Sequence, residues 1–324
     1  MIIVLLALAV VFDFLNGFHD SSNVVATPIS SNAMHPRLAL GLAAVSEFVA
    51  PFLFGVAVAT TIGEGLLNVE VLTVSVINAA LAGAIIWNLI TWYVGIPSSS
   101  SHALVGGLVG AALAAEGPSA VNPTGLVRVL LALLISPVLG MAFGYLTMRI
   151  VILATRSATP SVNRFFRGSQ VFTLTGLALS HGTNDAQKTM GVITMGLVAA
   201  GVLNTFVVPT WVVALSATAI ALGTFSGGWR LIRTLGGKIY RIRPVHAFSS
   251  QVSGAAVIFG AAMLGGPVST TQVMSSSIMG VGAADRINMV RWGILGDMAT
   301  AWLLTIPVTA VMAALLYLVI HALT

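Results

Sequence analysis

Two short polar clusters in an otherwise apolar chain hold the residues best suited to chemistry. The clusters are residues 17–23 and 182–188, and each contains one aspartate, Asp20 or Asp185. A charged side chain inside a membrane costs roughly 2.5–3.5 kcal/mol, so an acid kept there points to function. Such a carboxylate can take up a cation or a proton. Each aspartate could instead cap a helix fragment, although Ser or Asn would do so without a charge.

A second pair of clusters combines proline with hydroxyl side chains. Pro97 comes directly before residues 98–101, which are all serine, and Pro267 precedes the hydroxyl run 269–271. Proline favours the first turn of a helix, and hydroxyl residues beside it supply caps and donors. Helix starts also offer free N–H groups and the positive end of the helix dipole to an anion. Two such starts could face one another and bind a tetrahedral oxyanion, or the small residues could only let helices pack closely.

An anion site beside carboxylates distinguishes phosphate from sulfate. Hydrogen phosphate carries a hydroxyl that can donate to a carboxylate, whereas sulfate at neutral pH carries none. Sulfate would leave these acceptors repelled or unpaired. The residue chemistry therefore favours phosphate, with sulfate as the alternative oxyanion.

The elements that position these clusters must be membrane helices. The 324 residues include 14 Lys and Arg and 9 Asp and Glu; charged residues make up 7% and hydrophobic residues 57%. A soluble domain has about 25% charged residues. So few charges cannot cover a soluble surface, track nucleic-acid phosphates or keep a chain disordered. We predict an all-α polytopic membrane protein, with the lipid bilayer as a partner and no nucleic acid.

Several apolar stretches are shorter than the about 20 residues that cross a bilayer core. Examples are 103–115, 171–179 and 190–203, and each lies next to a polar cluster. Irregular backbone at membrane depth is tolerated only where it faces protein or a wet cavity. We therefore predict discontinuous helices, interrupted at the aspartate clusters as well as at the proline clusters, which meet at a site in the bilayer midplane.

The two halves of the chain form a repeat, because both pairs of clusters occur in the same order. Residues 60–71 carry Glu64 and Glu70 and no base, whereas the equivalent residues 226–244 carry Arg and Lys and no acid. By the positive-inside rule the two loops lie on opposite sides of the membrane, which makes the repeats inverted. An odd number of crossings in each half, about five, satisfies the loop charges and places both termini outside the cell. Inverted repeats are typical of transporters.

The same pattern predicts the organisation of the chain. We expect a first inverted repeat at 1–153, a basic cytoplasmic linker at 154–170 and a second inverted repeat at 171–324. The second repeat includes a basic amphipathic cytoplasmic segment at 228–243. That segment is an ordinary cytoplasmic loop or a site for lipid headgroups or a partner protein.

At these clusters the sequence resembles the PiT family of inorganic phosphate transporters. That family carries a Gly-x-Asn-Asp-x-x-Asn signature in both inverted halves, and residues 17–23 and 182–188 match it. The resemblance also includes the proline clusters and residues 228–236, and it covers nearly the whole chain. It implies phosphate import by secondary active symport in the cell membrane, as a homodimer. It implies no enzymatic activity and no cofactor besides a co-transported cation, either a proton or sodium.

The resemblance and the residue chemistry together predict the site. The predicted substrate-binding residues are Ser99, Ser100, Ser101, Ser269, Thr270, Thr271, Gln272, Asn23 and Lys188. The predicted ion-coupling residues are Asp20, Asp185, Asn184, Glu47 and His19. Glu47 is included because it lies within an apolar span, and His19 because it could relay protons near neutral pH, although a neutral hydrogen-bonded role is equally open. No metal site is expected at His102 or His181.

Two positions depart from the family signature. His19 replaces the Asn before the first aspartate, and Lys188 replaces the final Asn of the second copy. The resulting pattern is similar to the bacterial low-affinity branch, which is associated with proton coupling and uptake of neutral metal–phosphate complexes. The ammonium of Lys188 could act in place of a bound cation, attract phosphate, or snorkel to the interface. We therefore expect proton coupling, with sodium coupling as the alternative.

Two other functions compete with a symporter. An intramembrane serine hydrolase could use residues 98–101 with His102 or His181, but it needs one activated nucleophile, whereas the hydroxyl cluster is duplicated. A passive anion channel needs a continuous lining rather than two occluding clusters. The chain has no phosphate-binding loop for ATP.

Overall fold

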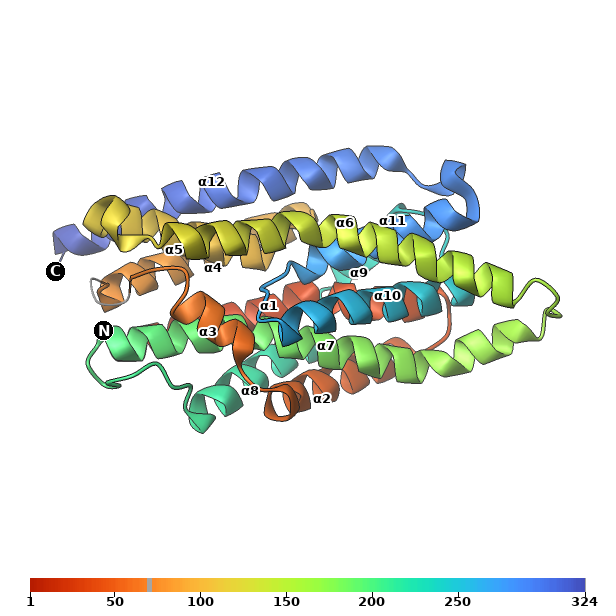
Figure 1. The fold of residues 1–324 in the computed structure, drawn as a ribbon, viewed down its shortest axis with the longest axis horizontal. Helices are drawn as coiled ribbons and strands as arrows, with labels where there is room; N and C mark the ends of the chain where they lie inside the picture. Colours follow the sequence, from red (N-terminus) through yellow and green to blue (C-terminus); the bar gives the residue numbers. More distant parts are fainter. Residues whose placement is uncertain (69–71, 324) are drawn as a thin grey trace.

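The computed structural model describes residues 1–68 and 72–323, and Glu70 lies outside the described residues. The described part is built from helices that run along one long axis (Figure 1). The first half contains α1 (Ile2–Ser30), α2 (Pro36–Phe54), α3 (Ala57–Gly63), α4 (Val74–Val94), α5 (Ser100–Glu116), η2 (Gly117–Ala120) and α6 (Pro123–Ala154). The second half contains α7 (Val162–Ala199), α8 (Thr210–Ser226), α9 (Trp229–Arg233), η3 (Thr234–Lys238), α10 (Pro244–Met263), α11 (Thr270–Arg286), η4 (Ile287–Met289) and α12 (Trp292–Leu323).

The surface of the bundle suits a lipid environment. Seven of the described helices are long and apolar enough to cross a membrane, or eight if the bent pair α8–α9 forms one span. The polar helices α7 and α11 are not among these candidate spans. Seven or eight spans are therefore fewer than the about five crossings in each half that the loop charges predict. Large apolar side chains such as Val138 on α6 and Leu303 on α12 are 66% and 70% exposed. The protein is therefore an all-helical, multi-span membrane protein.

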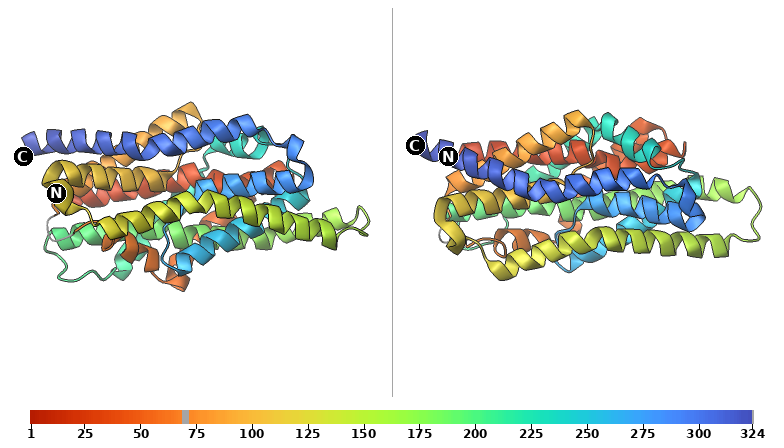
Figure 2. Two further views of the ribbon diagram at one scale, coloured as in Figure 1. Left: turned by 45° about the horizontal axis from the view of Figure 1, so that its top comes forward. Right: turned by 90° about the horizontal axis from the view of Figure 1, so that it is seen from above.

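The two halves have the same order of elements. Helices α1, α2, α4, α5 and α6 correspond to α7, α8, α10, α11 and α12. Both termini lie at one end of the bundle; α1 and α6 run away from that end, whereas α7 and α12 run toward it (Figures 1 and 2). Corresponding helices thus point in opposite directions, as inverted repeats require.

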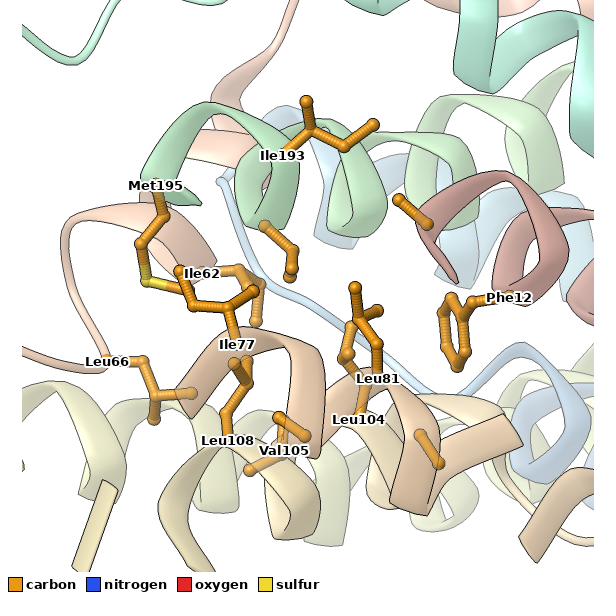
Figure 3. Close-up of a cluster of buried hydrophobic side chains, with 14 of the residues drawn as sticks. Phe12, Ile62, Leu66, Ile77, Leu81, Leu104, Val105, Leu108, Ile193 and Met195 are labelled. Carbon is orange, nitrogen blue, oxygen red and sulfur yellow. The ribbon is translucent and has the colours of Figure 1, made fainter. Parts of the chain in front are cut away.

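Helices from the two halves interlock. Helix α1 packs on α8 while its counterpart α7 packs on α2, and α5 packs on α12 while its counterpart α11 packs on α6. One apolar core cluster also joins the halves: Figure 3 shows Phe12, Leu81 and Leu104 of the first half in the same cluster as Ile193 of the second. Each half therefore buries apolar faces against helices of the other half.

Two helical hairpins enter the bundle from opposite ends, with their tips near its middle (Figure 1). Helix α4 ends at Gly95, whose φ of 81° is the left-handed conformation that glycine adopts readily. Ser99 then starts α5 by accepting the N–H of His102 at 3.1 Å. Gly265, with φ of 69°, and Ser269, which accepts an N–H at 3.3 Å, repeat this geometry between α10 and α11. The discontinuities predicted at the proline clusters are therefore present.

The aspartate clusters do not interrupt helices. Asp20 lies inside α1 and Asp185 inside α7, and each helix is continuous through its cluster. The predicted breaks at these positions are wrong, and so is the alternative that the aspartates cap helix fragments. Each polar turn is buried against polar side chains of other helices, so it keeps its helical backbone hydrogen bonds without facing lipid.

The basic segment at 228–243 folds back onto the protein. It forms α9 and the π-helical turn η3, and both contact α1. Its apolar side chains Leu231, Leu235 and Ile239 are fully buried. These three side chains therefore pack inside the protein, whereas Trp229 at the start of the segment is 45% exposed.

Candidate substrate and coupling site

Asp20 on α1 is buried and touches both hairpin tips. Its Oδ1 accepts a hydrogen bond from Thr271 Oγ1 at 3.0 Å and lies 2.9 Å from His19 Nδ1. Its Oδ2 lies 3.3 Å from the hydroxyls of Ser100 and of Thr270, both of which are oriented to donate. Because these hydroxyls start α5 and α11, the Asp20 carboxylate connects the two hairpins.

Asp185 on α7 is fully buried on the other side of the same cluster. Its Oδ2 accepts a hydrogen bond from Thr270 Oγ1 at 2.8 Å and lies 2.9 Å from His181 Nε2. Its Oδ1 accepts a charge-assisted hydrogen bond from the ammonium of Lys188. The single hydroxyl of Thr270 thus faces both aspartates.

His181 lies between two carboxylates. Its Nδ1 is 3.0 Å from Glu47 Oε1 and its Nε2 is 2.9 Å from Asp185 Oδ2, with all three side chains fully buried. The ring is turned so that neither contact has hydrogen-bond angles, and the two contacts are ion pairs only when the histidine is protonated. Thr224 Oγ1 donates to the other Glu47 oxygen at 2.5 Å. The cluster thus contains Glu47, one of the predicted coupling residues, together with a histidine that was not among the predicted site residues.

Asp13 is also absent from the predicted site residues. It is fully buried on α1, two helical turns before Asp20, and accepts a hydrogen bond from Thr189 at 2.5 Å. Asn16, between the two aspartates, accepts one from Ser100 at 2.6 Å. The spacing i, i+3, i+7 places Asp13, Asn16 and Asp20 on one helix face, and this spacing is the sequence signal that could have identified Asp13.

The predicted amide residues each use only one end of the side chain. Asn23 donates to Thr271 Oγ1 at 3.0 Å, and Asn184 donates to the Gly266 carbonyl at 3.1 Å. Within the described part of the chain, neither Oδ1 atom has a hydrogen-bond partner. Two buried acceptors are therefore free beside the aspartates.

The other predicted hydroxyl and amide residues lie at the hairpin tips. Ser99 and Ser269 cap α5 and α11, so their oxygens face their own helices. Ser101 Oγ accepts a hydrogen bond from Lys188 at 2.7 Å. Gln272 Nε2 lies 3.4 Å from His102 Nε2. The structure brings every predicted site residue into this region, but it directs only some of them toward the carboxylates.

Negative charge exceeds positive charge in the site. Among the described residues, one ammonium, that of Lys188, is buried beside the buried carboxylates of Asp13, Asp20, Glu47 and Asp185. Unpaired charges in a low-dielectric interior are costly, so this set of acids favours bound protons or cations. Asp20, His181 and Asp185 also place one potential ligand atom each within 4.8 Å of one another, which is the geometry of a cation site.

Two cavities approach the hairpin tips from opposite ends of the bundle. One, of about 630 Å³, has Glu64, Arg128 and Gly265 in its lining and reaches the tip between α10 and α11. The other, of about 460 Å³, has Gly95 and Arg230 in its lining and reaches the tip between α4 and α5. Each cavity has at least one arginine in its lining.

Known proteins resemble this chain over nearly its whole length. A family model described as the phosphate transporter family matches residues 16–313. The chain is 45% identical to a "probable low-affinity inorganic phosphate transporter" of Bacillus subtilis, over 99% of this chain and 97% of that protein. It is 42% identical to a Mycobacterium tuberculosis protein described in the same words, over 99% of this chain and 78% of that one. A solved structure described as "The sodium-dependent phosphate transporter" has a TM-score of 0.90 at 25% identity, covering 100% of this chain and 99% of that chain.

Proposed function

This chain belongs to the phosphate transporter family, and we propose that it imports inorganic phosphate in symport with protons. The observation that carries proton coupling is the position of His181 between Glu47 and Asp185. Carboxylate oxygens lie 3.0 and 2.9 Å from its two ring nitrogens, and a neutral imidazole carries no positive charge to offset them. The contacts need one further proton, on the ring or on one of the acids. A proton held in this way can be exchanged during transport.

Proton binding and phosphate binding are linked through the hydroxyls at the hairpin tips. Thr270 and Thr271 donate to Asp20 and Asp185 when these acids are ionised. Protonation of Asp20 gives that acid an O–H to donate and makes it a weaker acceptor, so the threonine hydroxyls are freed more easily to donate to a phosphate oxygen. If phosphate entered without protons, the carboxylates would be ionised and the threonine hydroxyls would already donate to them rather than to phosphate. This competition is a physical basis for moving the two ions together.

Phosphate would lie between the tips of the two hairpins, held by Ser100, Ser101, Thr270 and Thr271. The first-turn N–H groups of α5 and α11 have no intrahelical acceptor and suit an anion. The free Oδ1 atoms of buried amides such as Asn23 suit the hydroxyl of hydrogen phosphate. Sulfate has no such hydroxyl at neutral pH, so we propose that it binds less well.

A neutral metal–phosphate complex is a second form in which the substrate could enter. Asp20, His181 and Asp185 have the spacing to contact a divalent ion that arrives as cargo with phosphate. Uptake compared with and without magnesium, in the presence and absence of a chelator, tests this form. If uptake is the same with magnesium present and with magnesium removed by the chelator, free phosphate is the substrate.

The coupling ion is tested with purified protein in liposomes. We expect an acid-outside pH gradient alone to drive radiolabelled phosphate above its equilibrium level, and a sodium gradient alone to have no effect. Glu47→Gln should lose proton-driven accumulation but keep phosphate exchange, because it removes a proton-binding acid that contacts His181 rather than the hydroxyls proposed to hold phosphate. Glu116→Gln, an exposed acid, is the matched control. Accumulation driven only by sodium would overturn the proton proposal and favour the sodium-coupled alternative.

The assembly and its location complete the proposal. We place the protein in the cell membrane, with both termini outside, and propose the homodimer that the family resemblance implies. Light scattering of the protein in detergent or nanodiscs measures the number of chains, and a single chain under both conditions would contradict the homodimer.

A further inference from the structure

The ammonium of Lys188 is enclosed by oxygen atoms. It donates to Ser101 Oγ at 2.7 Å, to the Val268 carbonyl at 2.7 Å and to Asp185 Oδ1. These three acceptors use all three donors of an ammonium group, and the side chain is only 3% exposed. A hydroxyl, a backbone carbonyl next to a helix start and a carboxylate are the ligands that small alkali cations bind in transporters. Lys188 therefore has its positive charge where a free cation could bind.

The first half of the chain has the same arrangement without the ammonium. Asn23 is the counterpart of Lys188, and it donates to Thr271 of the opposite hairpin at 3.0 Å, as Lys188 does to Ser101. Thr271 also donates directly to Asp20, the aspartate of the first half, at 3.0 Å. In the second half the ammonium lies between the hydroxyl of Ser101 and the carboxylate. At this matched position the second half has an ammonium where the first half has an amide.

We propose that Lys188 is a tethered cation that fills a sodium position and so determines which ion the protein uses. This inference rests on the proposed proton coupling and extends it to the second half of the site. The tethered charge neutralises Asp185 in every state of the cycle, so sodium is not needed there. Protons then remain the mobile cation, through His181 and Glu47.

Replacing Lys188 by Asn makes the second half resemble the first. Lys188→Asn vacates Ser101 Oγ, the Val268 carbonyl and Asp185 Oδ1 and adds an amide oxygen to them. Together these oxygens form a hard-ligand site for sodium. We expect the variant to require sodium, whereas the wild-type protein does not respond to it.

Two measurements test this proposal. The first is the initial rate of phosphate uptake into liposomes at a fixed pH gradient, with sodium replaced stepwise by choline. We expect sodium to raise the rate of Lys188→Asn by about tenfold, equivalent to about 1.4 kcal/mol, and to leave wild type unchanged. The second is thermal unfolding in detergent, in which sodium should stabilise Lys188→Asn alone. Arg156→Asn, which removes an exposed cation, is the control and should behave as wild type.

The outcomes separate this inference from the proposed function. If folded Lys188→Asn shows neither a sodium-dependent rate nor sodium-dependent stabilisation, the tethered-cation proposal is wrong, while proton coupling of the wild type stands. Sodium stabilisation without recovered transport supports the site, because binding is then measured independently of turnover. Sodium-driven uptake by the wild type would overturn both proposals.

Discussion

Thr270 has one hydroxyl hydrogen but lies within hydrogen-bonding reach of two carboxylates, 2.8 Å from Asp185 and 3.3 Å from Asp20. It can donate to only one of them at a time. The unsatisfied carboxylate oxygen is more easily protonated or approached by the hydroxyl of hydrogen phosphate. A single threonine thus connects the two aspartates, so a change at one carboxylate alters the hydrogen bonding of the other.

At the scale of the residue we predict that Asp20→Asn and Asp185→Asn each abolish concentrative phosphate uptake. Asparagine has the same size and its amide oxygen can still accept a hydrogen bond at one of the two carboxylate positions, so the fold should persist, but an amide cannot take up a proton or balance a cation. Uptake should fall to the level of empty liposomes, while Glu116→Gln keeps normal uptake. Wild-type accumulation in either aspartate variant would remove that residue from the mechanism.

The two aspartates are identified from the sequence because their clusters occur twice. Asp20 and Asp185 stand out because two rare polar clusters recur in the same order. Asp13 and His181 have no such matched copy among the residues that were singled out. Their roles depend on partners far away in the chain, Thr189 for Asp13 and Glu47 for His181. Spacing on one helix cannot reveal those partners, so only the three-dimensional structure identifies them.

At the scale of the element, the predicted breaks in α1 and α7 fail for a physical reason. A local fall in hydropathy along the sequence is the same whether a helix ends there or continues and packs a polar turn against polar residues of other helices. Both proline clusters do end helices, because glycine at a positive φ and a serine cap stop and restart the backbone hydrogen bonding. Backbone signals such as glycine and a serine cap are local, so the sequence indicates them directly. The polarity of the helix that packs beside a polar turn cannot be predicted from the turn's own sequence.

The helix that carries Asp20 is placed by a close contact between glycines. A Cβ atom on Gly17 of α1 would lie 2.1 Å from the Ile220 carbonyl oxygen of α8, and one on Gly223 of α8 would lie 2.0 Å from the Phe14 carbonyl oxygen of α1. The two backbones therefore approach more closely than any side chain allows. This crossing lies one helical turn from Asp20 and fixes the depth of its carboxylate.

We therefore predict that Gly17→Ala destabilises the protein and Gly41→Ala does not. Overpacking at the α1–α8 crossing should cost about 1–3 kcal/mol. At Gly41, in α2, a Cβ meets nothing within 4 Å, and alanine there should be neutral or slightly stabilising. The unfolding temperature of each detergent-solubilised variant, monitored by size-exclusion chromatography after heating, measures the effect of both substitutions. Equal unfolding temperatures for Gly17→Ala and the wild type would contradict the tight crossing.

At the scale of the whole molecule, charge is distributed unevenly between the two ends of the bundle. The end that holds both termini also holds the C-terminal end of α5, whose last residue is Glu116, whereas the opposite end holds the turn from α6 to α7, which includes Arg156 (Figure 1). The positive-inside rule favours the arginine-rich end as the cytoplasmic one. This is the basis for proposing that the termini are outside the cell.

Because the chain has no cysteine, single introduced cysteines can test this orientation directly. Ser119→Cys lies in an exposed turn at the end with the termini, and Ser157→Cys in an exposed turn at the other end. We expect a membrane-impermeant maleimide to label Ser119→Cys in intact cells and Ser157→Cys only after permeabilisation. The reverse pattern would place the termini in the cytoplasm.

The interlocked halves also determine how the protein can be made. The first half leaves the ribosome before its packing partners exist, since α8 and α11 are synthesised after α7. Until then Asp20 lacks the hydroxyls of Thr270 and Thr271, and Asp13 lacks that of Thr189. An acid left unpaired in lipid costs roughly 2.5–3.5 kcal/mol. We therefore expect helix α1 to be released into the bilayer late, after the second half has supplied the partners of its acids.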